Sequence, residues 1–411
     1  MNITLTLRIL GALLLFLAIA LLVPVPFSWF YGDGAAGAFC LSAIISAGGG
    51  GLIYSRFRSA SDLSVREGFA VVTFGWTFFA LFGALPFVFS GAIPSYLNAF
   101  FETMSGFTTT GSTILTDIEA MPPSLLLWRS LTQWLGGMGI IVLSLAILPM
   151  LGVGGMQLFK AEVPGPTADR LKPRIQDTAK LLWGVYVLLT GAEVILLMVG
   201  GMGFFDGINH AFTTMATGGF STRNASVAAY DSAFIDWVIT LFMFLAGVNF
   251  SLHYLALRGK LGDFIRNEEF LFFSGLAMLG TLLIALLNMG GTYPDFFDNL
   301  RYSAFQVVSI LTTTGFGTAD YELWPVLCQY LLVFAMFIGG CAGSTGGGMK
   351  VARILLLFKH AHVQVYRLIH PRAVRLVKLG NRPVAKDVMQ SILGFFAVYL
   401  GVFVAASFIM A

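Results

Sequence analysis

The sequence of 411 residues carries little charge, because Asp, Glu, Lys and Arg make up only 11% of it. An ordinary soluble domain has about 25% charged residues. Hydrophobic residues make up 57%, and the mean hydropathy is +0.83. So few charges cannot cover a globular surface, which excludes a soluble two-domain enzyme, a disordered chain and a nucleic-acid-binding protein. We therefore expect an integral membrane protein.

Cysteine is also scarce. Cys40, Cys328 and Cys341 lie in apolar stretches, and no C-x-x-C pair occurs. The sequence therefore predicts neither a disulfide framework nor a zinc site, and the three side chains are expected to pack as small buried hydrophobes.

Long apolar runs are abundant. A spanning helix needs about 20 mostly apolar residues, and runs of this kind occupy 6–23, 36–54, 68–90, 125–151, 178–203, 234–257, 269–289, 326–358 and 388–411. The first run has no small-residue cleavage site after it, which favours a retained anchor over a signal peptide.

The basic residues alternate between the two sides of these spans. With a cytoplasmic N-terminus, 21 of the 24 Lys and Arg residues fall on inner segments, and Arg129, Arg223 and Arg301 fall outside. This asymmetry follows the positive-inside rule. The N-terminus is therefore predicted to be cytoplasmic.

The outer connections contain an internal repeat. Phe101, Ser105 and TTTG at 108–111 align with Phe305, Ser309 and TTTG at 312–315. A related ATGGFST at 216–222 falls in register if Gly219 matches Gly111. The glycines are then 108 and 96 residues apart, which indicates a repeat unit of about 100 residues. Each unit is expected to contain a span, a re-entrant segment and a second span.

The composition of the re-entrant segment indicates its chemistry. Irregular backbone at membrane depth is tolerated where it lines a water-filled cavity. Glycine permits a positive φ, and threonine suits an extended strand, so several such strands would present a ring of carbonyl oxygens to a cation. The candidate ion-binding residues are Thr109, Thr110, Gly111, Thr217, Gly218, Gly219, Thr313, Thr314 and Gly315.

These motifs resemble a known family. TTTGS at 108–112, TGGFST at 217–222, TTTGFGT at 312–318, WLGGMGIIV at 134–142 and GCAGSTGGGMK at 340–350 are similar to the Trk/Ktr/HKT superfamily of potassium transporters, in particular its TrkH-like membrane subunits. The resemblance implies an all-α membrane fold with four pseudo-symmetric pore units and potassium uptake across the bacterial inner membrane. It also implies a homodimer and a TrkA-like cytoplasmic regulatory subunit, with nucleotide bound only on that partner and no covalently bound cofactor.

A glycine-rich stretch interrupts the run at 326–358. A phosphate-binding loop is excluded, because Met349 stands where that motif needs lysine. Glycine favours a helix broken in mid-membrane. By resemblance this loop is a gate below the filter, made of Gly343, Ser344, Thr345, Gly346, Gly347, Gly348 and Lys350. Lys350 is expected either to repel cations at the inner pore or to extend to the membrane interface.

The expected organisation follows from these patterns. Two N-terminal helices occupy 1–66, and pore units 1, 2 and 3 occupy 67–157, 158–258 and 259–358, the last with a broken second helix. A basic cytoplasmic segment at 359–387 would contact inner-leaflet lipid or a partner, and 388–411 would be the first helix of a fourth unit. Its filter glycine is expected near 430, so the fourth unit is predicted to be incomplete in this sequence.

Other polar residues have less specific explanations. Glu193 in mid-span is expected to form a structural hydrogen bond more readily than to relay ions. Asn249 and His253, four residues apart, are expected to pack between helices. The acidic residues Asp117, Glu119, Asp320 and Glu322 would concentrate cations at the outer mouth, although a plain solvated rim has the same composition.

Two other functions remain open on the sequence. A broken-helix symporter of a small solute or of sodium would bind its substrate at half-helix ends, but it does not require a repeated Thr/Gly strand. An enzyme would need a nucleophile with a base, or clustered metal ligands, within the spans, and no such cluster occurs in the sequence. The expected function is therefore transport without catalysis.

Overall fold

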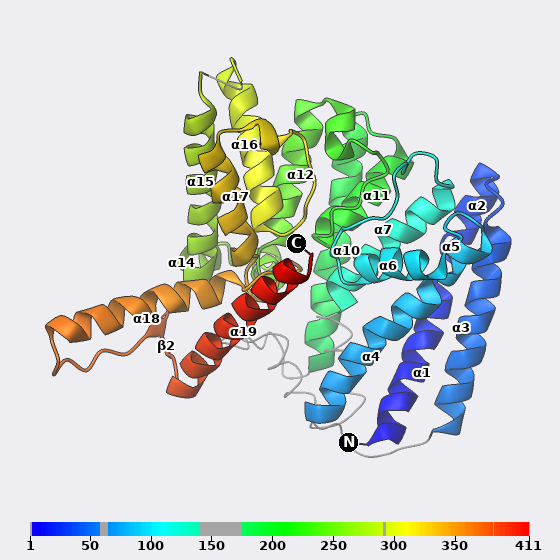
Figure 1. Cartoon of the computed structure of the whole chain (residues 1–411), viewed down its shortest axis with the longest axis horizontal. Coiled ribbons are helices and arrows are strands. Elements are labelled where there is room, and N and C mark those ends of the chain that lie inside the picture. The colour runs from blue at the N-terminus through cyan, green and yellow to red at the C-terminus, as the bar shows by residue number, and fades with distance from the viewer. Residues whose placement is uncertain (1, 58–64, 140–174, 291–292, 381, 411) are drawn as a thin grey trace.

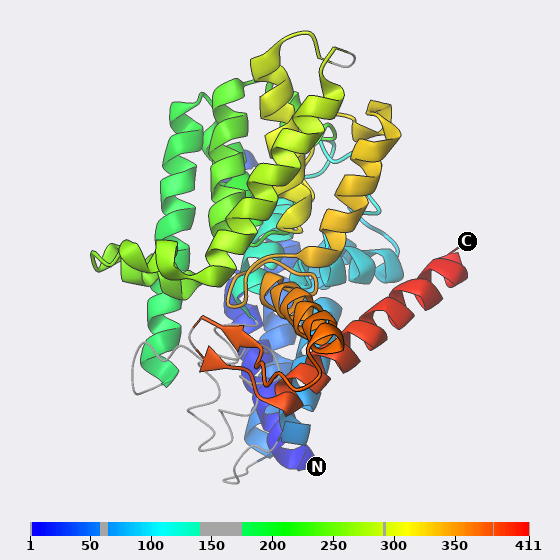
Figure 2. The same cartoon turned by 90° about the vertical axis from the view of Figure 1, so that its left-hand side faces the viewer.

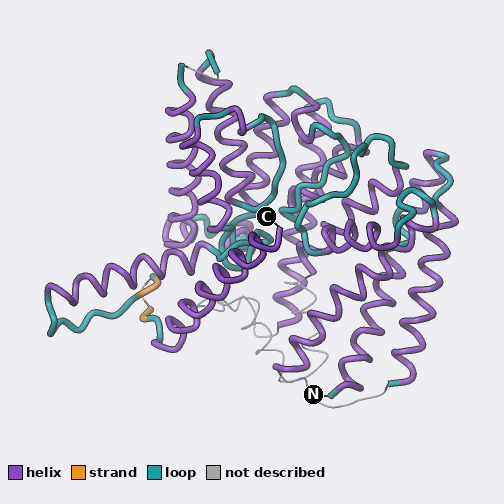
Figure 3. Tube along the Cα trace, viewed as in Figure 1, coloured by secondary structure: helices purple, strands orange, loops and turns teal. Residues whose placement is uncertain are grey.

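The computed structural model describes all residues except 1, 58–64, 140–174, 291–292, 381 and 411. Helices make up nearly all of the regular structure in these residues (Figure 3). The two strands in the described part, β1 (Lys378–Leu379) and β2 (Arg382–Pro383), pair in one short antiparallel hairpin. The chain therefore has the all-α membrane fold expected from its composition.

The helices follow the order of the repeat. The N-terminal part contains α1 (Ile3–Ala20), α2 (Val25–Tyr31) and α3 (Ala36–Arg56). Unit 1 contains α4 (Val65–Gly83), α5 (Leu85–Phe89), α6 (Tyr96–Phe107) and α7 (Pro123–Met138). Unit 2 contains α10 (Ile175–Val199), α11 (Phe204–Met215), the 3₁₀ helix η2 (Ser226–Tyr230), α12 (Ala233–Ala246) and α13 (Phe250–Leu257). Unit 3 contains α14 (Gly262–Arg266), α15 (Glu268–Asn288), α16 (Phe296–Leu311), the 3₁₀ helix η3 (Tyr321–Leu323), α17 (Val326–Ile338) and α18 (Val351–Ile369), and α19 (Lys386–Met410) comes last.

Helices α1 and α3 pack closely because glycines face each other. A Cβ on Gly50 would lie 2.8 Å from the carbonyl oxygen of Gly11. Small residues of this kind let membrane helices approach until their backbones touch. The pair buries Leu14, Leu17 and Phe39. Helix α4 packs against α1, on the side away from α3 (Figure 1). Units 2 and 3 share a second core that includes Tyr186, Phe250 and Phe273.

The helix that precedes the Thr/Gly segment in each repeat unit is too short to cross a bilayer. Helices α6, α11 and α16 have 12, 12 and 16 residues, which at 1.5 Å per residue gives about 18 to 24 Å. The side chains of Ser95 and Asp295 cap the starts of α6 and α16. Each of the three helices ends at its Thr/Gly segment, as the repeat predicted.

Six segments of the described chain are long and apolar enough to span a membrane, and the bent pair α12–α13 makes seven if it is counted as one. Two of the nine expected spans, 125–151 and 326–358, are not among these segments. Residues 140–151 of the expected span 125–151 lie outside the described residues. The expected span 326–358 is broken, since α17 ends at Ile338 and α18 begins at Val351.

The prediction of a continuous helix at 234–257 was wrong. Helix α12 ends at Ala246, and α13 leaves it at an angle of 103°. The physical reason is that the backbone at the bend also pairs with the glycine-rich loop. Cys341 N–H donates to the carbonyl of Gly247 at 2.8 Å, and Phe250 N–H donates to that of Gly343 at 3.0 Å.

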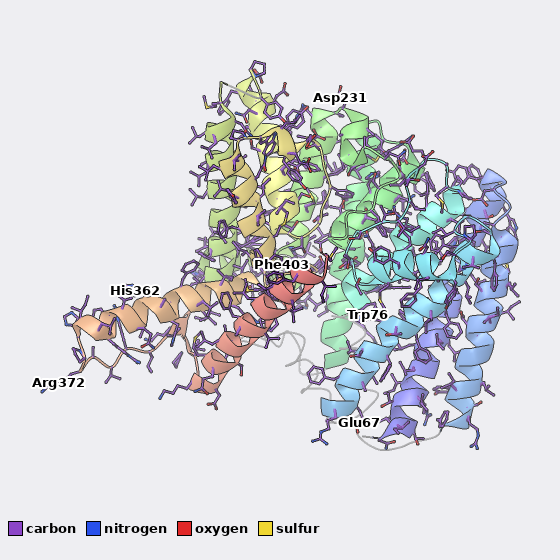
Figure 4. All side chains as sticks on the ribbon, in the orientation of Figure 1. Glu67, Trp76, Asp231, His362, Arg372 and Phe403 are labelled. Carbon is purple, nitrogen blue, oxygen red and sulfur yellow. The ribbon has the colours of Figure 1, made fainter. Side chains whose placement is uncertain are left out.

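Helix α18 projects from the body of the molecule (Figure 1), and the β hairpin lies beside it (Figure 2). His362 and Arg372 lie on this projecting arm (Figure 4). Helix α18 runs through the expected boundary at 358/359 without a break. Helix α19 begins at Lys386, close to the expected start at 388.

Candidate functional site

The three short helices end in the same way. In unit 1, Thr109 N–H donates to Gly106 O at 2.9 Å and Thr110 N–H donates to Ser105 O at 2.9 Å. Residues 217–218 and 313–314 repeat this pattern at 2.8 to 3.1 Å. This is the Schellman arrangement, in which a left-handed residue closes a helix. The register in which Gly219 matches Gly111 and Gly315 is therefore present in the backbone.

The left-handed residue that closes each helix is threonine. Thr109, Thr217 and Thr313 have φ of 52°, 52° and 62°. The prediction that threonine would be extended here was wrong, because the Schellman hydrogen bonds impose a positive φ. A β-branched residue in this region is strained, and strain of this kind gathers at functional sites. Two residues later, Gly111, Gly219 and Gly315 have φ of 80°, 74° and 86°.

Two of the three glycines touch the next unit. A Cβ on Gly111 would overlap the carbonyl oxygen of Gly218, and a Cβ on Gly219 would overlap that of Thr314. The Thr/Gly segments of units 1, 2 and 3 are therefore adjacent in sequence order. Glycine is required here by space as well as by φ. At Gly315 a Cβ would meet no described atom within 4 Å.

A polar side chain on each short helix also contacts the residues that follow the glycine of its unit. Nine residues before the glycine stand Glu102, His210 and Gln306. Glu102 accepts from the Thr113 hydroxyl and from Ile114 N–H at 2.9 Å each. His210 Nε2 lies 3.0 Å from Ser221 Oγ, and Gln306 Nε2 donates to Ala319 O at 3.2 Å. The sequence motifs did not indicate these three residues, although their common spacing of nine residues from the glycine is a signal in the sequence.

Helix α7 connects units 1 and 2, and we call the contacts made by Glu102, Arg129, Gln133, Gly218, Phe220 and Ser221 the 1–2 interface. Gln133 Nε2 donates to Gly218 O at 2.8 Å, and Gln133 Oε1 accepts from Phe220 N–H at 3.0 Å. The carbonyl of Gly218, expected to be free for an ion, is therefore held by an amide. In the WLGGMG motif, a Cβ on Gly136 would overlap Phe107 O, and one on Gly137 would lie 2.7 Å from the Ala216 Cα. These glycines let α7 pass between the ends of α6 and α11.

Beside their Thr/Gly segments, units 2 and 3 meet through neutral groups, and we call the contacts of His210, Ser226, Ala228, Phe316 and Gly317 the 2–3 interface. Ala228 N–H donates to Gly317 O at 3.1 Å, and Gly317 N–H donates to the Ser226 hydroxyl at 3.2 Å. The His210 and Phe316 rings lie 5.7 Å apart. No ion pair links the residues of this interface in the described part of the chain.

The glycine-rich loop packs against the ends of α11 and α12 and against the Thr/Gly segment of unit 3. The Thr345 hydroxyl contacts Met215 O at 2.9 Å and Ala246 O at 3.2 Å, and Gly347 N–H donates to the Thr313 hydroxyl at 2.7 Å. Ala342 N–H donates to Glu269 at 2.6 Å, which ties the loop to α15. Lys350 has a φ of 71°, and its ammonium donates to the carbonyl of Gly346 within the loop.

The remaining sequence candidates have mixed outcomes. Both Glu193 carboxyl oxygens are buried, and the Thr214 side chain is the hydrogen-bonding group beside them. Asn249 caps α13 in the bend, and His253 contacts Leu245 O at 2.8 Å. This pair stabilises the break between α12 and α13, which agrees with the expected polar packing.

The acidic residues expected at the outer mouth, Asp117, Glu119, Asp320 and Glu322, are exposed. Asn224 Nδ2 donates to Asp117 at 3.1 Å, and Arg223 lies 3.6 Å from Glu119. Two of the four acids therefore join the outer loops of units 1 and 2.

The comparisons with known proteins agree with this architecture. The TrkH family, described as cation transport protein, matches residues 38–410. The Trk system potassium uptake protein TrkH of Salmonella typhimurium is 44% identical over 407 residues, which cover 97% of this chain and 84% of that protein. The Escherichia coli protein TrkG is 35% identical over 395 residues, covering 95% of this chain and 81% of TrkG. The crystal structure of the potassium transporter TrkH from Vibrio parahaemolyticus superposes with a TM-score of 0.89 at 38% identity, covering 98% of this chain and 85% of that one.

Proposed function

The chain belongs to the TrkH family of cation transport proteins, and from this premise we propose that it takes up potassium across the bacterial inner membrane. Its relatives are named as potassium uptake proteins and not as enzymes. Potassium is then the substrate, and the activity needs no covalently bound cofactor. The proposal depends most on one observation, the threefold repetition of the left-handed Thr and Gly pair at 109/111, 217/219 and 313/315.

This repeated geometry suits a dehydrated cation. The proposed filter consists of residues 109–111, 217–219 and 313–315, whose carbonyl oxygens would replace the water around potassium. Positive φ at alternate residues prevents the segment from continuing as a regular strand or helix, so its carbonyls are not all used in secondary structure. Gly218 is the exception, because its carbonyl accepts from Gln133. We therefore assign ion contact in unit 2 to Thr217 and Gly219.

The proposed gate is the loop that contains residues 343–348 and Lys350. Its bonds to Thr313 and Met215 support this role, because they join the loop to the ends of two short helices at the filter. Opening would require at least these two hydrogen bonds to break. The Lys350 ammonium donates to the carbonyl of Gly346. This bond supports a role for Lys350 in holding the loop together and does not favour an extension of its side chain to the membrane interface.

The assembly is proposed from the resemblance. We expect a cytoplasmic N-terminus, a homodimer and a TrkA-like regulatory subunit that binds nucleotide. The basic arm formed by α18 and the residues up to 387 is the proposed contact for that subunit or for inner-leaflet lipid. Its projection from the bundle supports this role, because it leaves the arm accessible (Figure 1).

Uptake by a host that lacks its own potassium transporters tests the function. The complete protein should restore growth at low potassium and accumulate rubidium, a potassium analogue, in preference to sodium. Gly315→Ser should lower that preference without abolishing uptake. Equal accumulation of sodium and rubidium by the unchanged protein would contradict the proposed function.

A further inference from the structure

One ion pair in the 1–2 interface lies directly behind the proposed filter. Arg129 Nε and Glu102 Oε1 are 2.6 Å apart, and their side chains are 3% and 0% exposed. A buried charge pair needs good geometry and additional hydrogen bonds to offset the loss of water. Both conditions hold for Glu102, since Thr113 and Ile114 also donate to its carboxylate.

Arg129 joins this carboxylate to the next unit. Its Nη1 donates to the carbonyl of Ser221 at 3.0 Å, and its guanidinium lies 3.6 Å from the centre of the Phe220 ring. The planar guanidinium can make these contacts together, because it offers several donors at its edge and a face for an aromatic ring. A lysine ammonium at the same position has no such face.

The residues on the two sides of the pair hold equivalent positions. Thr113 follows Gly111 by two residues, and Ser221 follows Gly219 by two residues. The pair therefore fixes the outgoing chains of two neighbouring filter segments against each other. In unit 3 the corresponding residue is Gly317, which is held by Ser226 and Ala228 without any charge.

We propose that the Arg129–Glu102 pair is a positioning element for ion selectivity, which sets the separation of the filter segments of units 1 and 2. The inference rests on the proposed potassium uptake and extends it to residues that do not touch the ion. Selection of potassium over sodium requires carbonyl groups held at a favourable separation or field strength. A shift of Ser221 or Thr113 would reach Gly219 or Gly111 through only two residues of backbone.

Paired substitutions test the proposal by the ratio of rubidium to sodium uptake at matched amounts of folded protein in the membrane. Arg129→Lys and Glu102→Gln should each lower this ratio by about tenfold, which corresponds to about 1.4 kcal/mol of lost discrimination. Arg301→Lys is the matched control. Arg301 also joins two units, with Asp236 at 3.5 Å, but its ion pairs and hydrogen bond in the described part of the chain go to Asp236, Asp298 and Tyr302, none of which lies in a filter segment. Its ratio should stay at the wild-type value.

Thr113→Val keeps the test informative if the buried substitutions prevent folding. Thr113 is exposed, and the change removes its two hydroxyl bonds to Glu102 together with the one it accepts from Leu115 N–H, and leaves the ion pair itself in place. It should lower the ratio in the same direction by a smaller factor. An unchanged ratio in folded Thr113→Val protein, or in folded Arg129→Lys protein, would overturn the proposal. If the wild-type protein takes up no rubidium, the proposed function itself is refuted.

Discussion

The 1–2 and 2–3 interfaces join equivalent segments by different means. At the 1–2 interface a buried ion pair and the Gln133 amide hold Gly218, Phe220 and Ser221. At the 2–3 interface Ser226 and the backbone of Ala228 hold Gly317. Buried charged and amide groups are costly unless every partner is in place. The 1–2 interface should therefore tolerate change less well than the 2–3 interface.

The difference shows how a repeat can keep its backbone while its supports diverge. The Schellman bonds and the positive φ values recur in all three units. The polar residue nine positions before each glycine differs, however, as Glu102, His210 and Gln306. An approximate symmetry of main chain is thus maintained by side chains of unlike charge, and only the charged one recruits a counter-ion from α7.

The largest expected effect comes from Gly219, which lies between Gly218 and Phe220 of the 1–2 interface and itself touches unit 3 at Thr314. Gly219→Ala should reduce rubidium uptake by roughly tenfold or more, equivalent to at least 1.4 kcal/mol in the barrier. Alanine at a φ of +74° is strained, and its Cβ would overlap Thr314 O. Gly201→Ala is the control, because Gly201 has a φ of +93° but meets no atom within 4 Å. Wild-type uptake by Gly219→Ala would show that the close contact has no functional role.

The second largest effect is expected from Gln133→Leu, which changes only the 1–2 interface. Gln133→Leu leaves Gly218 O and Phe220 N–H without their partners, which costs about 1 to 3 kcal/mol for each buried group. The thermal midpoint in detergent and the rubidium preference should both fall. Gln329→Leu is the matched control, since Gln329 bonds only to the carbonyls of Glu322 and Trp324 near the surface. Equal losses in the two variants would contradict a special role for Gln133.

Much of this comparison was accessible from the sequence. Apolar runs predicted most spans, because about 20 residues must cross the bilayer whatever their neighbours are. The alignment of Gly111, Gly219 and Gly315 predicted the repeated backbone, since glycine is rarely replaceable at a positive φ. The role of these residues in ion binding stays a prediction.

The missed features depend on contacts between distant segments. The bend after Ala246 lies within an apolar run, and its cause is pairing with residues almost a hundred positions later. The left-handed threonines at 109, 217 and 313 contradict local preference, because the helix-end hydrogen bonds outweigh it. Arg129 was assigned to an outer segment by charge counting, but it is buried against Glu102. Local pattern alone could not reveal any of these three.

A smaller effect is expected at the 2–3 interface. Ser226→Ala removes the hydroxyl that accepts from Gly317 N–H, at a cost of about 0.5 to 1.5 kcal/mol. The backbone bond between Ala228 and Gly317 remains, so the rubidium preference should change less than in Gln133→Leu. Ser391→Ala on the exposed side of α19 controls for loss of a hydroxyl. A larger effect for Ser226→Ala than for Gln133→Leu would reverse the order of the two interfaces.

The smallest effect is expected at the outer rim of the 1–2 interface, where Arg223 lies 3.1 Å from Asp206 and 3.6 Å from Glu119. Arg223 is 41% exposed, so water and salt screen the pairs and Arg223→Gln should cost less than about 1 kcal/mol. Burial raises the pKa of Asp206, but hydrogen bonds from Thr222 and Arg223 outweigh it and hold that pKa below its ordinary value.

A depressed pKa determines the sign of the pH dependence. The stabilisation from Asp206 is present above the unfolded pKa of about 4 and is lost as the pH falls through the lower folded value. The thermal midpoint of the wild type should therefore fall more steeply than that of Arg223→Gln as the pH drops below about 4. High salt should bring the two proteins together at neutral pH. If Arg223→Gln instead lowered the rubidium preference as much as Arg129→Lys, selectivity would depend on charge anywhere along the 1–2 interface and not on the buried pair.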